Sequence, residues 1–315
     1  MSRRLLVAGH RGLLGSALLA QIAGTPTWDL ATVPHGTDFR DRELTERTVR
    51  QAQPDAVLLV AGKVGGLGDN IRHPAEFLED NLRIQTNVIR AAYEAGATDL
   101  VFVASANAYP ADAPQPIPES ALGTGLLDAD TEAYGLAKLT GMRLCEMYRR
   151  QYGVRYRSVA PCNLYGSGDR FDPSTAHVVP AMLHRFHEAA TTDAGSIAVW
   201  GSGNQRRQLL HANDLADACL HVLAQARDFP THLNVGPHDD VSIAELAHLV
   251  ADVVGFAGRI DFDTSKPEGV QRRLLDVSAL ADTGWRPAIE LRDGVAMTYD
   301  WYLQQVAAAA VETRT

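Results

Sequence analysis

Tyr134 and Lys138 stand four residues apart in the segment EAYGLAKLTG. On an α-helix this spacing places the two side chains on one face, about 6 Å apart. A lysine ammonium beside a phenol stabilises the phenolate, so the pair predicts a tyrosine that exchanges protons near neutral pH. The same spacing also occurs by chance on helix surfaces, so the pair by itself does not establish an active site.

Ser105 lies upstream of this pair, where the apolar run LVFVASANAYP turns polar. Asn107 follows two residues later and cannot act as a base, because a carboxamide does not ionise near neutral pH. Ser105, Tyr134 and Lys138 follow one another in an order that a chance Tyr–Lys pair does not explain.

A glycine motif precedes these residues in AGHRGLLGSAL, immediately after the first apolar strand and at the start of a helical pattern. Gly9 allows a tight turn, Gly12 lets a pyrophosphate approach the backbone, and Gly15 lets the helix pack close to the sheet. The spacing GxxGxxG is one residue longer than the GxGxxG form. A glycine-rich turn without a ligand is the alternative, but the strand, turn and helix context favours a dinucleotide site.

The residues after the second strand bear on the choice of cofactor. The segment TVPHGTDFRDREL has no acidic residue at the strand end to bind an adenosine ribose 2′-hydroxyl. Arg11, and also His35, can instead face a 2′-phosphate, which favours NADP(H) over NAD. Asp38 is a candidate acceptor for the adenine amino group, with a solvated loop aspartate as the alternative.

These motifs require elements that bring them to one edge of a sheet. Apolar strands are predicted at residues 4–9, 27–33, 55–62, 99–105, 155–161 and 232–236, separated by amphipathic helices. The clearest helix covers residues 81–96, where Gly96 can take the left-handed C-terminal position. Continuous apolar strands alternating with helices predict an α/β fold, a Rossmann-type doubly wound parallel sheet covered on both faces.

The alternation ends after Gly166, and a smaller C-terminal α/β substrate-binding lobe is predicted. Ser242 and Glu245 have the spacing of a capping box at the start of one of its helices. The expected dinucleotide-binding domain comprises residues 1–165 with about 207–236, and the substrate-binding domain comprises about 166–206 and 237–315.

Composition excludes several classes of function. The chain has 315 residues, 46% of them hydrophobic, and a net charge of −9, which argues against a nucleic-acid partner. The three cysteines, Cys145, Cys162 and Cys219, have neither disulfide nor zinc-site spacing, so no metal is expected. The apolar run at the N-terminus is too short for a signal peptide or membrane span, and a cytoplasmic location is expected.

The chain resembles the extended short-chain dehydrogenase/reductases that act on nucleotide-activated sugars, and within them the GDP-L-fucose synthase family. This resemblance covers nearly the whole chain and rests on the glycine motif, AGKVGG, YGLAKLTGMRLCE, PCNLYG, AHVVPAMLHRFHEA, VWGSG and LLHANDLADA. It implies an NADPH-dependent enzyme that epimerises and reduces GDP-4-keto-6-deoxymannose. It also implies a homodimer, for which we expect helices 81–96 and 132–150 to pair.

The resemblance implies roles for particular residues. Ser105 and Tyr134 match the pair that binds the sugar C4 carbonyl, Lys138 matches the lysine that lowers the tyrosine pKa and holds the nicotinamide ribose, and His177 matches a general acid of epimerisation. The predicted cofactor residues are Gly9, Arg11, Gly12, Leu13, Gly15, Asp38, Ala61 and Lys138. The predicted substrate residues are Asn163, Arg185, Trp200, Arg207 and Arg273.

Two positions depart from the family pattern. The family has a lysine where this chain has Arg273, and a cysteine, the base of epimerisation, where it has Asn107. We therefore expect a 4-keto reductase of a 4-keto-6-deoxy nucleotide sugar, GDP-linked, without double epimerisation at C3 and C5. The alternatives are a bifunctional epimerase/reductase, an NAD-dependent nucleotide-sugar epimerase, and a dinucleotide-binding regulator without catalysis.

Overall fold

Six parallel strands form the central sheet of the computed structural model, which describes residues 2–24, 26–31, 33–172, 176–225, 229–266 and 270–312. Their order is β10-β5-β4-β3-β1-β2. The strands are β1 (Arg3–Ala8), β2 (Trp28–Ala31), β3 (Ala56–Leu59), β4 (Asp99–Val103), β5 (Arg155–Pro161) and β10 (His232–Val235). This arrangement confirms the predicted Rossmann-type α/β fold.

The strand bounds differ from the predicted ones mainly at the carboxyl ends. β5 has the predicted bounds, whereas β3 and β4 end earlier, because the chain leaves the sheet there to form the loops of the site. Residue 32, in the strand predicted at 27–33, lies outside the described residues. The side chains of β3 and β4 are buried along their whole length, as a sheet covered on both faces requires.

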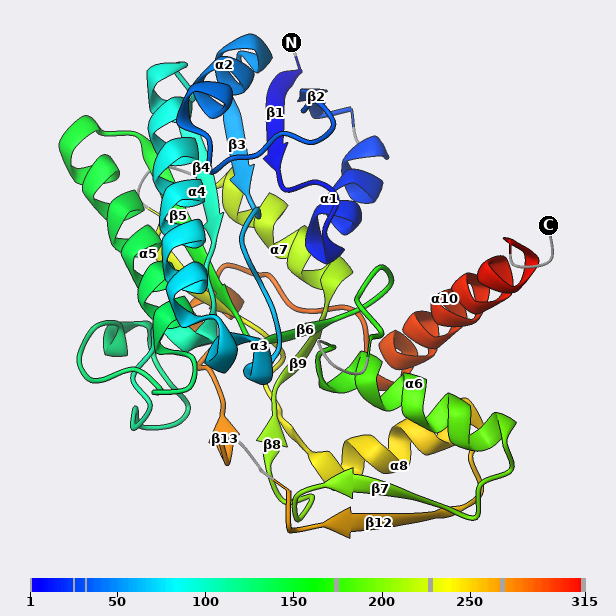
Figure 1. Cartoon of the computed structure of the whole chain (residues 1–315). Helices are drawn as coiled ribbons and strands as arrows, with labels where there is room; N and C mark the ends of the chain where they lie inside the picture. The colour runs from blue at the N-terminus through cyan, green and yellow to red at the C-terminus, as the bar shows by residue number, and fades with distance from the viewer. Residues whose placement is uncertain are drawn as a thin grey trace.

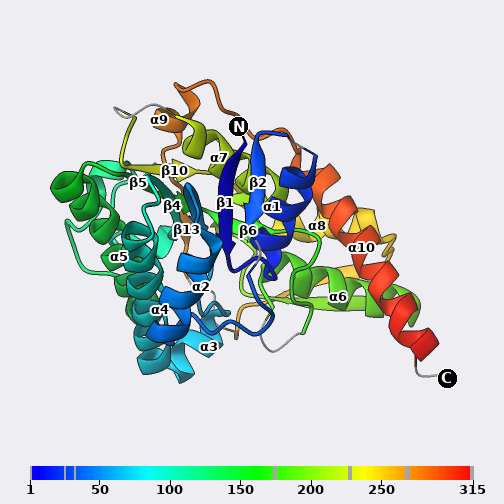
Figure 2. The ribbon, with the colours of Figure 1, turned by 90° about the horizontal axis from the view of Figure 1, so that it is seen from above.

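Helices cover both faces of this sheet (Figures 1 and 2). One face carries α2 (Arg42–Ala52), α4 (Pro74–Glu94) and α5 (Glu132–Tyr152), and the other carries α1 (Leu13–Ala23) and α7 (Ala212–Ala224). α4 begins before the predicted residue 81, because Pro74 occupies a first-turn position where its fixed φ favours a helix. Gly96 has φ +86°, which confirms its left-handed conformation after this helix.

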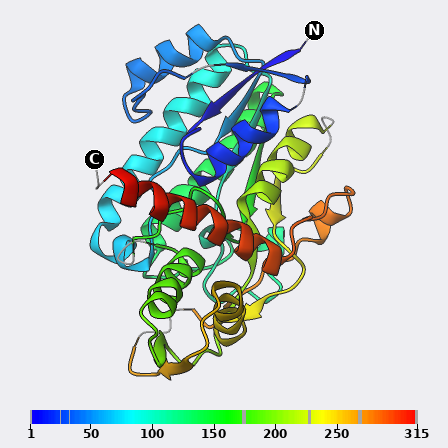
Figure 3. The ribbon, with the colours of Figure 1, turned by 90° about the vertical axis from the view of Figure 1, so that its right-hand side faces the viewer.

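A smaller lobe lies below the carboxyl ends of the strands (Figures 1 and 3). Its helices are α6 (Val178–Thr191), α8 (Ile243–Val254) and α10 (Leu291–Glu312), and they share a second hydrophobic core. Ser242 and Glu245 form both bonds of the predicted capping box. The existence of two cores agrees with two domains, and the predicted domain boundaries stay a prediction.

Within the ranges that the structure describes, the short strands form three small sheets apart from the main one. β7 (Ser196–Trp200) pairs with β12 (Arg259–Asp263), β6 (Asn163–Tyr165) pairs with β9 (Leu209–His211), and β8 (Arg206–Arg207) lies between β11 (Val241–Ser242) and β13 (Arg272–Arg273). The remaining short elements are α3 (Leu67–Arg72), α9 (Ser278–Ala281) and the 3-10 turns η1 (Ala106–Ala108) and η2 (Glu119–Ala121). In the described part of the chain, no helix has the length and apolar character needed to cross a membrane.

Candidate active site

The glycine loop after β1 has the geometry of a dinucleotide-binding turn. Gly9 has φ +101°, and a Cβ at this position would lie 2.5 Å from the backbone nitrogen of Ala61. A Cβ on Gly15 would lie 2.2 Å from the carbonyl oxygen of Gly9. Both positions therefore require glycine, because any larger residue would separate the loop from β3 and from α1.

The first turn of α1 leaves space for an anion. Gly12 is the N-cap residue and has no side chain, no acidic residue lies in the first turn, and a Cβ at Gly12 would meet nothing closer than an oxygen 3.9 Å away. The backbone N–H groups that begin at Leu13 carry the partial positive charge of the helix N-terminus. Arg11 is exposed on the same loop. These residues fit the pyrophosphate of a dinucleotide cofactor.

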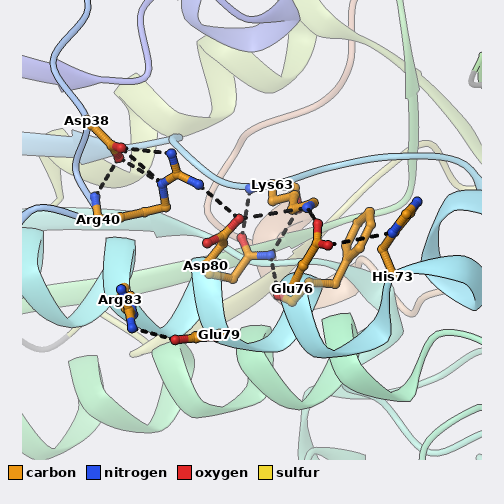
Figure 4. Close-up of polar contacts among 10 residues, drawn as sticks. Asp38, Arg40, Lys63, His73, Glu76, Glu79, Asp80 and Arg83 are labelled. Carbon is orange, nitrogen blue, oxygen red and sulfur yellow. Dashed lines mark hydrogen bonds and ion pairs between the residues drawn. The ribbon is translucent and has the colours of Figure 1, made fainter.

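Asp38, the predicted acceptor for adenine, is engaged by Arg40 (Figure 4). The Arg40 guanidinium donates from Nε to Asp38 Oδ1 over 2.9 Å and from Nη2 to Oδ2 over 2.8 Å. This hydrogen bonding lowers the pKa of the Asp38 carboxyl. An adenine amino group must therefore share the carboxylate with Arg40, and the predicted role of Asp38 stays a prediction.

The same chain of charges continues to the loop after β3 (Figure 4). Arg40 Nη1 contacts Asp80 over 3.3 Å, and Lys63 forms ion pairs with Asp80 and Glu76. Asn81, buried on α4, accepts a hydrogen bond from the backbone N–H of Lys63 and donates one back to its carbonyl oxygen. Asn81 thereby fixes the loop beside Ala61. The sequence analysis missed this residue, and its signal is a polar side chain on the apolar face of a helix.

The first turn of α5 packs closely against the turn that follows β4. A Cβ on Gly135 would lie 2.3 Å from the carbonyl oxygen of Asn107, so glycine allows this close approach. The contact brings Tyr134 to Ser105, whose side chain hydrogen-bonds the phenol and also accepts from the backbone N–H of Asn107. The structure therefore brings together the predicted serine and tyrosine from segments far apart in the sequence.

Burial controls the protonation of this group. Burial raises the pKa of Tyr134 to about 12, although the Ser105 hydrogen bond opposes the shift, and burial lowers the pKa of Lys138 to about 8. Lys138 Nζ donates to the carbonyl oxygen of Val103 over 2.9 Å. Desolvation of the phenolate is thus the largest effect on the tyrosine pKa in this structure, and the expected lowering of that pKa by Lys138 stays a prediction.

Arg273 contacts the same turn from the opposite direction. Its Nη1 donates to Asn107 Oδ1 over 2.7 Å. Arg207 is the neighbour of Arg273 in the ladder between β8 and β13, and Nη1 of Arg207 donates to the backbone carbonyl of Val270. The two predicted substrate residues therefore lie side by side, and Arg273 reaches the turn that follows β4.

His177 has an acidic neighbour that the sequence analysis did not identify. The Nδ1 atom of His177 lies 3.7 Å from Asp169 Oδ1, and the Asp169 carboxylate is buried. Asp169 Oδ2 has no hydrogen-bond partner among the described residues.

The other predicted substrate residues lie on the smaller lobe and the strands that lead to it. Arg185, on α6, donates to the carbonyl oxygen of Ala198, and Trp200, at the end of β7, has a side chain that is 59% exposed. Asn163 is exposed on β6. Arg185 and Trp200 form a second group, separate in the chain from the Ser105 turn. The charge of Arg185 suits an anionic ligand, and the exposed ring of Trp200 suits a planar one.

The sequence pattern of the NAD dependent epimerase/dehydratase family matches residues 5–236, which include the glycine loop, Ser105, Tyr134 and Lys138. The chain belongs to this family. Within the family, the chain is 46% identical over 306 residues to the putative GDP-L-fucose synthase 2 of Arabidopsis thaliana, covering 97% of this chain and 93% of that protein.

Two solved structures of epimerase/dehydratase relatives are similar to this chain over nearly its whole length. A GDP-6-OMe-4-keto-L-xylo-heptose reductase from C. jejuni superposes with a TM-score of 0.89 at 31% identity, covering 96% of this chain and 98% of that one. The GDP-mannoheptose C4 reductase from Campylobacter jejuni with NADP bound superposes with a TM-score of 0.86 at 32% identity, with the same coverage.

Proposed function

We propose that this chain is an NADPH-dependent 4-keto reductase of a GDP-linked 4-keto-6-deoxy sugar that does not epimerise both C3 and C5. The broader assignment, an NADP-dependent oxidoreductase that acts on nucleotide sugars, follows from the family and from its similarity to GDP-L-fucose synthases and GDP-heptose reductases. The observation that carries the specific proposal is the catalytic turn, where Ser105 meets Tyr134 and Asn107 meets Arg273.

The residues of the glycine loop fit NADPH, which supplies the hydride when it is bound. Tyr134 is a suitable proton donor to the C4 oxygen, because a phenol with a pKa of about 12 stays protonated at neutral pH. Ser105 has a single O–H donor, which hydrogen-bonds the phenol in this structure and can donate to the C4 oxygen when substrate is bound. Lys138 anchors the tyrosine helix to β4 through the carbonyl of Val103.

Epimerisation requires chemistry that the turn does not offer. A proton bound to carbon must be removed beside the ketone and another returned to the opposite face, which needs a titratable side chain near C3 and C5. Asn107 has none, and its carboxamide oxygen is already engaged by Arg273. A bifunctional epimerase/reductase is the second candidate, favoured by His177 with its buried Asp169 partner, which can deliver a proton.

Purified protein incubated in D2O with NADPH and GDP-4-keto-6-deoxymannose tests the proposal. We expect NADPH oxidation and a product that carries no deuterium at C3 or C5 by NMR. Deuterium at both carbons with inverted couplings would contradict the proposed absence of double epimerisation. No NADPH oxidation with this sugar would contradict the proposed substrate.

We also propose a homodimer in which α4 and α5 of each copy pack together. The two helices lie side by side on one face of the sheet (Figure 1). Leu136 on α5 has 42% of its surface exposed and Tyr152 at the end of the same helix has 44%, so α5 keeps apolar and aromatic surface that a second copy can cover.

A further inference from the structure

The contact between Asn107 and Arg273 joins segments that are far apart in the sequence. The carboxamide oxygen of Asn107 is the acceptor for Arg273 Nη1 at 2.7 Å, and the carbonyl oxygen of Ala106 lies 3.4 Å from the same nitrogen. A hydrogen bond from a cation is stronger and more directional than a neutral one. Two acceptors on one turn therefore fix one arm of the guanidinium at the carboxyl end of β4.

The other arm of this guanidinium has no acceptor. Arg273 Nη2 is buried without a hydrogen-bond partner, and within the described ranges no carboxylate lies within ion-pair distance of Arg273. Burial lowers the pKa of Arg273, and the charge of Asp128 opposes this shift only in part, so the protein compensates the guanidinium charge incompletely. A buried donor without a partner costs free energy, which a ligand oxygen would recover.

Arg207 strengthens the case for an anionic ligand. Arg207 and Arg273 are paired in register on adjacent strands, and burial together with the charge of Arg273 lowers the pKa of Arg207. Hydrogen bonds from Arg207 Nη1 go to backbone carbonyls of Arg206 and Val270. Two half-buried guanidinium groups side by side repel each other unless a doubly charged group, such as a diphosphate, neutralises both.

We propose that Asn107 is a positioning residue that holds Arg273 so that its free Nη2 donates to the diphosphate of the nucleotide sugar. This inference rests on the proposed function and goes further, because it gives the residue at the catalytic turn a role in binding. Asn107 acts through Arg273 and does not itself touch the ligand. The side chains at positions 107 and 273 then act as one unit. A cysteine at position 107 would not hold the arginine in the same way, because a thiol is a poor acceptor for a guanidinium.

A double-mutant cycle tests this unit by calorimetric binding of GDP, and separately of UDP, to protein saturated with NADP. Arg273→Ala should weaken GDP binding by about 10- to 100-fold, the range for a hydrogen bond to a charged group. Asn107→Ala should weaken it by about 3- to 10-fold. The double variant should bind GDP no worse than Arg273→Ala alone, because Asn107 has nothing left to position.

Steady-state kinetics separate positioning from a general structural effect. Asn107→Ala should raise KM for the nucleotide sugar and leave kcat within about threefold, because Ser105 and Tyr134 are unchanged. Arg272 is the matched control, since it precedes Arg273 on β13 but pairs with Asp240. Arg272→Lys should keep the wild-type affinity for GDP, whereas Arg273→Lys should lose part of it.

Two results would overturn the inference. One is a loss of GDP affinity in the double variant that equals the product of the two single losses, and the other is no binding of either nucleotide to the wild-type protein.

Failure of the proposed function would give other results. Binding of UDP but not GDP would contradict the proposed nucleotide, and the cycle would then be measured with UDP. Binding of GDP without NADPH oxidation by the keto sugar would contradict the proposed reaction and leave the cycle measurable.

Discussion

Lys138 Nζ donates a hydrogen bond to the backbone carbonyl of Val103 and lies 5.6 Å from the ring centroid of Tyr134. The ammonium is thus buried between the end of β4 and the helix that carries the tyrosine. This contact connects the two elements whose relative position decides whether Tyr134 reaches Ser105. It also places a cation where desolvation is costly.

The buried ammonium predicts a pH dependence of stability. Burial lowers the pKa of Lys138 from its ordinary value of 10.5 to about 8. Below about pH 8 the amine is charged in both states and its burial cost is complete; between about pH 8 and 10 the folded protein loses this proton first, so the cost falls as pH rises. The free energy of unfolding of the wild-type protein, measured relative to that of Lys138→Met, should therefore rise by at most about 3 kcal/mol as the pH increases through this range.

Urea unfolding of the two proteins at about pH 7 and about pH 10 measures this difference. Using the difference removes the contributions of the buried cysteines and tyrosines, which both proteins share. If the difference in unfolding free energy between the two proteins stays constant or falls as the pH rises, Lys138 is not a buried cation.

Tyr134→Phe removes the proposed proton donor. We expect turnover to fall by about 100-fold or more, the usual contribution of a general acid, with NADPH affinity unchanged. NADPH oxidation at saturating keto sugar and fluorescence titration of the cofactor measure the two properties. Tyr152→Phe, at the exposed end of the same helix, is the control and should keep wild-type turnover. Near wild-type turnover in Tyr134→Phe would remove the tyrosine from the mechanism.

Arg11→Ala tests the origin of cofactor preference. Because Arg11 is exposed on the glycine loop, we expect it to bind the 2′-phosphate of NADPH, and its loss should reduce the preference for NADPH over NADH by about 1–2 kcal/mol. The ratio of kcat/KM for the two cofactors measures this preference. Arg83→Ala, an exposed arginine on α4 that pairs with Glu79, should leave the ratio unchanged. Equal use of NADH by the wild-type protein would refute the prediction.

Asn107→Cys tests the connection between this position and epimerisation. A thiol with an ordinary pKa near 8.5 can be tuned into the range of a base by a neighbouring cation, and Arg273 supplies one. We expect deuterium exchange beside the ketone to appear in Asn107→Cys and to be absent from the wild type and from Asn107→Ala. Exchange in Asn107→Ala would assign the proton transfer to another group, with His177 the first candidate.

Leu136→Glu tests the proposed dimer. A carboxylate on the α5 face should be tolerated by a monomer but should disrupt an apolar contact between copies, so the mass by light scattering should halve. Leu126→Glu is the control, because Leu126 is 86% exposed in the loop before α5. A wild-type protein that is monomeric at micromolar concentration would refute the proposal directly.

Local patterns were sufficient for the sheet and for bringing forward Ser105, Tyr134 and Lys138 as the candidate catalytic groups, whose roles stay a proposal. Apolar runs of strand length, the glycine spacing after the first of them and the four-residue spacing of Tyr134 and Lys138 all act within a few residues of the chain. Their structural consequences therefore follow from the sequence alone. The strand β5, the left-handed Gly96 and the capping box at Ser242 were predicted for the same reason.

Tertiary structure decided the properties that depend on burial and on distant neighbours. The pKa of Tyr134 rises because the folded chain removes water from the phenol, which no spacing between Tyr134 and Lys138 reveals. Three site residues have partners that come from other segments of the chain: Asn107 contacts Arg273, His177 lies near Asp169, and Lys63 is bound by Asn81. Only the order of the strands and the packing of the lobe bring these partners together. Long-range contacts of this kind leave no periodic signal in the sequence, because each depends on where two independent segments meet in the fold.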